Sequence, residues 1–337
     1  MRVLVTGGTG FVGSFIVVAL LRDGHDVRLL ARRPDQVPRT FAPHGVTIDD
    51  VVAGDVLDVP VVQQAVQGCD AVVHAAAIFS FDPRAAESML STNAAAARTV
   101  LDAAVAEGCD PVVHVSSTVA LVRQGGTTPD LPLGDLTLPY SRSKIESEEH
   151  ARRLQAEGRP VVTVYPGGVY GPHDPYLGEQ TRRMTWLARG LFPLWPSGGM
   201  HVVDVREVAD VVAAVMEPGR GAPRYVVPGH HVGAEAIFSA VGRAIGRRRP
   251  HVTIPASLVT PVTAPLDAAQ RFLPERWRYP ADREAGEVAA RDTRFDDSPA
   301  RRELGVEPRP WQETVDHTIA WMVDAGHLPE RYRPAAS

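Results

Sequence analysis

The chain has 337 residues and a net charge of −5, which suits one or two domains and gives no general attraction to nucleic acid or membranes. No apolar run reaches the length of a membrane span, and no targeting pattern precedes the first apolar run. Cys69 and Cys109 form no metal-ligand spacing, and together these features predict a cytoplasmic protein without a metal site.

The first half of the chain alternates short apolar runs, expected to be strands, with longer helical stretches. The expected strands are Arg2–Thr6, Asp26–Ala31, Val46–Val52, Ala71–Ala75, Pro111–Ser116 and Pro160–Tyr165. The expected helices are Phe11–Arg22, Val59–Val66, Arg84–Ala106 and Ser141–Ala156. This alternation predicts an α/β fold with a Rossmann-type, doubly wound parallel sheet covered by helices on both faces. Such sheets bind ligands at the carboxyl ends of their strands.

The second half is less regular and richer in Pro and Arg. Helices are expected near Glu179–Arg189, Val205–Met216, Ala234–Ile245 and Trp311–Asp324. We expect residues 1–165 to form a dinucleotide-binding domain, to which 201–217 return, and residues 166–337 to form a smaller substrate-binding lobe. Six apolar side chains are candidate pocket walls, with ordinary core packing as the alternative: Phe192, Leu194, Trp195, Phe272, Leu273 and Trp277.

A glycine-rich segment, TGGTGFVG, joins the first expected strand to the first expected helix. Gly7, Gly10 and Gly13 would permit a tight turn and a close approach of the backbone to a pyrophosphate. The pyrophosphate would then lie at the helix N-terminus, beside Phe11 and Val12, where free N–H groups and the helix dipole favour an anion. A plain glycine-rich turn is the alternative, and the strand-to-helix context favours dinucleotide binding.

The second strand ends in VRLLARRP, where folds that select NAD carry an acidic residue for the ribose 2′-hydroxyl. Arg32 and Arg33 stand there instead, and a guanidinium can pair with the 2′-phosphate of NADP. A solvated pair of loop arginines is the alternative, so NADP is expected and NAD remains open. Five further residues are expected to border the cofactor: Asp55, Val56, Ala75, Ala76 and Ala77.

The candidate chemical groups follow the fifth strand and open the next helix. Ser116 and Ser117 end the segment VVHVSS, and Tyr140 and Lys144 lie four residues apart in YSRSK, on one face of a helix. A nearby ammonium is expected to lower the pKa of the tyrosine, which then donates a proton to a carbonyl oxygen. Only Ser117 is expected to point into the cleft, because neighbours on a strand face opposite ways.

Through these motifs, the chain resembles the extended short-chain dehydrogenase/reductase family, the NAD-dependent epimerase/dehydratase superfamily. The closest branch is the one that resembles dihydroflavonol reductases and hydroxysteroid dehydrogenases. The segments that carry the resemblance are TGGTGFVG, GDVLD, VVHAAA, VVHVSS, YSRSK, PGGVYGP, HVVDVREVADVV and SPARRELGVEPRPWQETVDHTIAWM. They span nearly the whole chain.

The resemblance implies roles for individual residues. It makes Gly7, Gly10 and Gly13 the phosphate loop, Ser117 the catalytic hydroxyl, Tyr140 the proton donor and Lys144 the group that binds the nicotinamide ribose. Asn93 matches a helix asparagine that supports the active site, with an exposed helical asparagine as the alternative. The segment with Pro166, Gly167 and Val169 matches the part that passes the nicotinamide carboxamide. Thr118 and Val119 replace the Asp-Glu pair of nucleotide-sugar dehydratases, which argues against that chemistry.

The sequence therefore predicts an NADP-dependent reductase of a ketone or aldehyde, acting reversibly on a small-molecule carbonyl or alcohol. The alternatives are a nucleotide-sugar epimerase with tightly bound NAD(P) and a dinucleotide-binding sensor or scaffold without turnover. A homodimer is expected through Arg84–Ala106 and Ser141–Ala156, where Ala94 to Ala97 would allow close approach. The same alanines also suit packing on the sheet.

Overall fold

A seven-stranded parallel sheet is the centre of the structure, a computed structural model that describes all residues except 81, 125–129, 271, 273–282 and 335–337. Its order is β10-β6-β5-β4-β1-β2-β3. The strands are β1 (Arg2–Thr6), β2 (Asp26–Ala31), β3 (Val51–Ala53), β4 (Ala71–His74), β5 (Val112–Val115), β6 (Val161–Tyr165) and β10 (Arg224–Val226). The order reverses between β1 and β4, the point at which such sheets bind ligands. The expected Rossmann-type α/β fold is confirmed.

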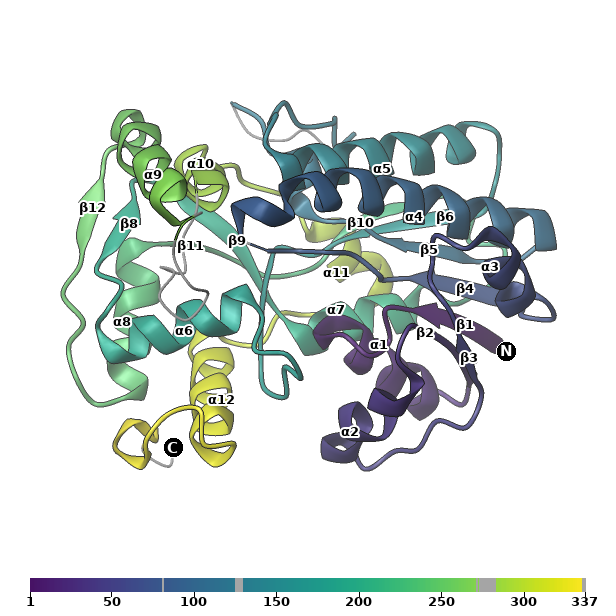
Figure 1. Cartoon of the computed structure of the whole chain (residues 1–337), viewed down its shortest axis with the longest axis horizontal. Coiled ribbons are helices and arrows are strands. Elements are labelled where there is room, and N and C mark those ends of the chain that lie inside the picture. The colour runs from purple at the N-terminus through teal and green to yellow at the C-terminus, as the bar shows by residue number, and fades with distance from the viewer. Residues whose placement is uncertain (81, 125–129, 271, 273–282, 335–337) are drawn as a thin grey trace.

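Helices cover both faces of this sheet, as Figure 1 shows. On one face lie α3 (Val59–Val66), α4 (Ala86–Glu107) and α5 (Pro139–Ala156). On the other lie α1 (Phe11–Arg22) and α7 (Val205–Ala214), with α2 (Val37–Phe41) near the sheet edge. The alternation of strand side chains assigns them to these layers. In β1, Val3 and Val5 join the core with α1, whereas Leu4 joins the core with α3 and α4.

Two strands differ from the expectation. Residues 46–50 lie outside the sheet, and β3 begins only at Val51 and pairs with the last three residues of β2. Asp50, just before β3, accepts bonds from the guanidinium groups of Arg2 (2.6 Å) and Arg28 (3.1 Å). These ion pairs, together with a bond from the Leu29 N–H to the Asp50 carbonyl at 2.9 Å, hold the residue before β3 against β1 and β2. The short strand β10 was not expected; it pairs with β6 as the seventh strand.

The remaining elements form the end of the molecule away from the N-terminus. One small sheet has the order β11-β9-β7, and β8 pairs with β12. Their bounds are β7 (Gly168–Tyr170), β8 (Leu194–Pro196), β9 (Gly199–Asp204), β11 (His230–Gly233) and β12 (Val252–Ile254). The helices there are α6 (Glu179–Arg189), α8 (Ala234–Ala244), α9 (Ala256–Gln270), α10 (Arg283–Ala290) and α12 (Trp311–Asp324), while α11 (Ser298–Leu304) packs near β10 and α7.

Two segments beyond residue 165 pack with the main sheet. Val208, Val211 and Val212 of α7 share the core of α1, and β10 extends the sheet itself. The proposed division into a domain and a lobe stays a prediction. Among the described helices, none combines the length and the apolar character that crossing a membrane needs. Ala94, Ala96 and Ala97 of α4 are buried within the chain, so they serve its own packing.

Candidate active site

Two joined cavities open at the carboxyl ends of the strands. One, of about 350 Å³, lies between the ends of β4, β5 and β6 and the helices α5, α6 and α10, and we call it the catalytic cavity. The other, of about 360 Å³, lies at the ends of β1, β2 and β3, and we call it the cofactor cavity. Both are lined by Gly7, Gly10, Ala75, Ala77 and Tyr176. Together they form one cleft that crosses the place between β1 and β4 where the strand order reverses.

The glycine loop has the close approach that a dinucleotide needs. Gly7 has a φ of +76°, a region that favours glycine, and a Cβ at Gly13 would lie 2.1 Å from the Gly7 carbonyl oxygen. Helix α1 starts after Gly10 with no side-chain cap and no acidic residue in its first turn. Its free N–H groups therefore face the cleft without a competing anion, and a pyrophosphate fits this end of the helix.

The other expected cofactor residues line the same cleft. Arg32 and Arg33 are exposed at the end of β2 and border the cofactor cavity together with Asp55, Val56 and Ala76. The sequence did not point to Tyr176, which lines both cavities and whose hydroxyl lies 2.8 Å from the Gln36 side-chain amide. This contact connects the loop before α6 to the segment after β2. The roles of all these residues stay predictions.

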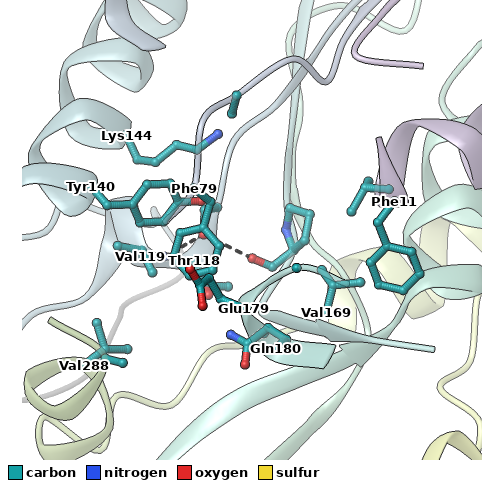
Figure 2. Close-up of a pocket in the computed structure, with 18 of the residues that line it drawn as sticks. Phe11, Phe79, Thr118, Val119, Tyr140, Lys144, Val169, Glu179, Gln180 and Val288 are labelled. Atoms are coloured by element: carbon teal, nitrogen blue, oxygen red, sulfur yellow. Dashed lines mark hydrogen bonds between the residues drawn. The ribbon is translucent and has the colours of Figure 1, made fainter. Parts of the chain in front are cut away.

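The chemical groups converge in the catalytic cavity (Figure 2). Tyr140 lies in the first turn of α5, which Pro139 opens, and Lys144 follows one turn later. The Lys144 Nζ lies 6.0 Å from the centre of the Tyr140 ring and donates a hydrogen bond to the Val115 carbonyl at 3.4 Å. Phe79 packs against Tyr140, with the centres of the two rings 4.7 Å apart. The tyrosine is thereby held between a cation and an aromatic wall.

Both serines after β5 are among the residues that line this cavity, and which of the two hydroxyls points into it stays a prediction. The Ser116 N–H donates to the Val164 carbonyl of β6 at 2.9 Å, so the pairing of β5 with β6 continues to this residue. Ser117 caps the short helix that follows: its Oγ accepts from the Val119 N–H at 3.2 Å and donates to the Pro166 carbonyl at 3.5 Å. The Ser116 hydroxyl is buried and interacts with the Glu148 carboxylate of α5, which opposes the rise that burial causes in the pKa of that carboxyl.

The pKa of Tyr140 departs from the expected direction. Burial raises the pKa of Tyr140 well above its ordinary value, and the nearby Glu284 carboxylate raises it further, while hydrogen bonding to Ser117 opposes the shift. The expected lowering of this pKa is therefore wrong for this structure, because burial is the largest influence on it and the Lys144 ammonium lies 6.0 Å from the ring centre. A raised pKa keeps the phenol protonated at neutral pH, as a proton donor requires.

Lys144 is the single lysine of the chain. It is 5% exposed, and burial lowers its pKa from 10.5 to about 8, although the Glu148 carboxylate acts in the opposite direction. Glu148 lies one turn further along α5, fully buried, and accepts bonds from the Tyr165 hydroxyl (2.5 Å) and the Arg152 guanidinium (2.9 Å). This network holds the Glu148 carboxylate near Lys144, where it favours the ammonium form of the lysine near neutral pH.

The N-terminus of α5 is capped from a distant part of the chain. Glu284, in the first turn of α10, accepts hydrogen bonds from the backbone N–H groups of Tyr140 (3.2 Å) and Ser141 (2.5 Å) and from the Ser141 hydroxyl. Burial raises the pKa of this carboxyl. Sequence analysis missed Glu284 because its partner is 144 residues away and no local pattern marks it.

Asn93 lines the cofactor cavity rather than the catalytic one. Its side chain accepts from the Ile78 N–H at 2.8 Å and donates to the Ile78 carbonyl (3.0 Å) and to the Ser143 hydroxyl (3.1 Å). It therefore fixes the loop after β4 against α5. Pro166, Gly167 and Val169 line the catalytic cavity, and a Cβ at Gly167 would lie 2.3 Å from the His201 carbonyl oxygen.

The six candidate pocket walls separate into three groups. Phe192, Leu194 and Trp195 line a small apolar cavity beside the catalytic one, whereas Phe272 is 89% exposed. Leu273 and Trp277 lie outside the described residues. The apolar wall of the catalytic cavity comes instead from residues that the sequence did not single out, including Phe79, Met200, Val288 and Phe295. Among the described residues, no group of three or more metal-ligating side chains is close enough to hold a metal ion.

Comparison with known proteins places this geometry in a family. The family model described as "NAD dependent epimerase/dehydratase family" matches residues 3–227. The chain is 28% identical to the sterol demethylase protein B of Methylococcus capsulatus, over 97% of this chain and 100% of that protein. It is 27% identical to the 4-hydroxy-2-methyl-3-oxo-4-farnesyl-3,4-dihydroquinoline-1-oxide ketoreductase of Stigmatella aurantiaca, over 90% and 91%. The crystal structure of gox2253 superposes with a TM-score of 0.80 at 27% identity, covering 97% of this chain and 99% of that one.

Proposed function

The chain belongs to the NAD-dependent epimerase/dehydratase family, and from this premise we propose that it is an NADPH-dependent reductase that converts a ketone or aldehyde to an alcohol, reversibly. The observation that carries the proposal is the convergence of Ser117, Tyr140 and Lys144 in a cavity that continues into the dinucleotide cleft. These are a hydroxyl, a protonated phenol and an ammonium at one place, the groups that polarise and protonate a carbonyl oxygen.

When bound, the reduced nicotinamide supplies a hydride to the carbonyl carbon. The residues of the chain act on the carbonyl oxygen of the substrate. Ser117 donates a hydrogen bond to it, and Tyr140 transfers its phenolic proton to it as negative charge develops. The raised pKa of Tyr140 keeps that proton in place until a stronger base, the developing alkoxide, is present. Lys144 holds the ribose and places a positive charge beside the resulting phenolate.

The choice of NADP rests on Arg32 and Arg33. Both border the cofactor cavity where the second strand ends, the place at which the 2′ position of a bound adenosine lies in dinucleotide folds. A pair of exposed guanidinium groups attracts a phosphate and gives a bare ribose no comparable bond. Tyr176 and Gln36 lie beside them and close this part of the cavity.

Charge in the catalytic cavity favours a reductase over a nucleotide-sugar epimerase. Its charged lining, in the described part of the chain, comprises two cations and three carboxylates: Lys144, Arg183, Asp174, Glu179 and Glu284. A nucleoside diphosphate brings two further negative charges and would meet this carboxylate excess. The names of relatives point the same way, since they include a ketoreductase and a 3-beta-hydroxysteroid dehydrogenase of Mycolicibacterium neoaurum.

The test is NADPH oxidation with a panel of aldehydes, ketones and nucleotide sugars. We expect turnover with at least one carbonyl compound and loss of turnover in Tyr140→Phe. Interconversion of a nucleotide sugar without net oxidation of NADPH would establish the epimerase instead. Tight NADPH binding without turnover of any carbonyl compound or nucleotide sugar would favour the sensor or scaffold.

A further inference from the structure

A separate apolar cavity adjoins the catalytic cavity, and we call it the side chamber. It has a volume of about 70 Å³ and lies between β8, β12, α9 and α10. Most of its wall is aliphatic or aromatic carbon: Phe192, Leu194, Trp195, Pro196, Met200, Ile254, Val259, Val262, Ala285, Gly286 and Ala289. The two other lining residues are Arg183 and Thr263, and the Thr263 hydroxyl is already bonded to the Val259 carbonyl at 2.8 Å. Such a lining receives carbon chains and offers little to a phosphate or a sugar.

The side chamber and the catalytic cavity share three lining residues, Arg183, Met200 and Ala285. The Arg183 guanidinium packs 5.9 Å from the centre of the Trp195 ring and donates to the Gln180 side chain at 3.2 Å. The catalytic cavity and the side chamber therefore meet at the anchored Arg183, the small Ala285 and the flexible Met200. Methionine is unbranched and adapts its shape at low cost, so it can make room for a chain that passes between the cavities.

The helix α10 lines both the catalytic cavity and the side chamber. Ala285 and Val288 of this helix face the catalytic cavity, while Ala289 and Gly286 line the side chamber. In Figure 2, Val288 lies across the cavity from Lys144, on the opposite side of Tyr140. Helix α10 thus forms a continuous wall from the catalytic cavity to the side chamber.

We propose that the side chamber binds the apolar tail of the substrate, which is an elongated carbonyl compound with a hydrocarbon chain remote from the reacting carbon. The inference deepens the proposed function and rests on it. Without the chamber, the catalytic cavity would select among small carbonyl compounds by the reacting end alone. With the chamber, specificity grows with the length of the carbon chain that leaves the catalytic cavity.

The test measures kcat/KM with NADPH for 2-butanone, 2-hexanone, 2-octanone and 2-decanone. Once the chain is long enough to enter the side chamber, kcat/KM should rise about fourfold for each added methylene, the effect of burying one CH₂ group. The rise should level off when the chamber is full. Equal kcat/KM values across the series, in an enzyme that reduces them all, would overturn the chamber and leave the reductase standing.

Variants locate the effect in the chamber. Ala289→Leu fills it, and the ratio of kcat/KM for 2-decanone over 2-butanone should fall at least tenfold. Ala290→Leu is the matched control, because Ala290 is the next residue of α10 and lines neither cavity. Should Ala289→Leu fail to fold, Thr263→Leu on α9 makes the same test from the facing wall. An unchanged ratio in a folded chamber variant would overturn the proposal.

A second measurement does not depend on turnover. The alcohols 1-butanol to 1-decanol are titrated against the protein, with tryptophan fluorescence as the signal, since Trp195 lines the chamber. Affinity that increases with chain length and weakens in Ala289→Leu would support the chamber even if no ketone is reduced. Affinity independent of length would overturn it.

Discussion

The carboxylate of Glu284 accepts a hydrogen bond from the backbone N–H of Tyr140 at 3.2 Å, across 144 residues of chain. The helix that carries Glu284 also lines the catalytic cavity through Ala285 and Val288. One short helix therefore lines the catalytic cavity and holds the start of the helix that carries Tyr140, the proposed proton donor. The position of Tyr140 depends on how α10 is seated.

Removing the Glu284 side chain tests this dependence. Glu284→Ala leaves the first N–H groups of α5 without their cap, a loss that costs about 1 kcal/mol of stability. Because it also frees the start of α5, hydride transfer should slow by about tenfold or more, while NADPH affinity changes little. Glu284→Gln retains an acceptor and should restore most of the rate. Glu235→Ala, at an exposed carboxylate of α8, is the control and should transfer hydride at the parent rate.

We expect the arginine pair Arg32 and Arg33 to determine the choice between NADP and NAD. Replacing Arg32 and Arg33 by Ala should weaken NADP binding by one to two decades for each charge-assisted bond lost, about 1.5–3 kcal/mol. NAD binding should be nearly unchanged, since it has no 2′-phosphate. Tryptophan fluorescence titration with both nucleotides measures this. The exposed pair Arg247 and Arg248, replaced in the same way, is the control. Equal affinities of NADP and NAD for the parent protein would refute this assignment.

The two serines should differ in effect. Ser117→Ala removes the hydroxyl that is already held by Val119 and Pro166 and that lies beside Tyr140, so turnover should fall by about tenfold to a thousandfold, as for an oxyanion donor. Ser116→Ala removes a buried hydroxyl that interacts with Glu148, and turnover should change less. Single-turnover kinetics with an active carbonyl substrate compares them. If Ser116→Ala is the more damaging change, Ser116 is the group that holds the carbonyl oxygen.

The single lysine permits a direct titration of the site. An amine reacts in its neutral form, so modification of Lys144 by trinitrobenzenesulfonate should increase as the pH rises through about 8, rather than through 10.5. Peptide mass spectrometry separates this product from the modified N-terminus. Glu148→Gln removes the charge that raises the lysine pKa, so the rise should occur at lower pH. NADPH should protect Lys144 if the lysine binds the cofactor. A titration near 10.5 would contradict the buried environment described above.

The parts of the fold that the sequence predicted well are those encoded by local pattern. The β-branched runs keep the hydrophobic pattern of a strand, and the segments between them keep the hydrophobic pattern of a helix over many residues. Glycine spacing marks the turn after β1. The edges of the sheet were predicted poorly. The strand expected at Val46–Val52 begins only at Val51, and β10 has only three residues, Arg224–Val226, too few to show a period.

In the site, the motif residues were found because each lies at the end of a strand or the start of a helix. The expected catalytic and cofactor residues all line one of the two cavities. What the sequence could not provide are contacts between distant segments. Glu284, Tyr176 and the side chamber depend on how α6, α9 and α10 pack on the sheet. The pKa of Tyr140 was predicted in the wrong direction, since the extent of burial does not follow from a four-residue spacing.

The most direct test of the proposed chemistry is single-turnover hydride transfer in Tyr140→Phe. The variant keeps the ring that packs on Phe79 and removes the hydroxyl that carries the transferable proton. NADPH affinity should stay close to that of the parent, and the rate of hydride transfer should fall by about 10²–10⁴-fold, the range for loss of a general acid. Hydride transfer at the parent rate, with the same carbonyl substrate and saturating NADPH, would show that another group donates the proton and would contradict the mechanism.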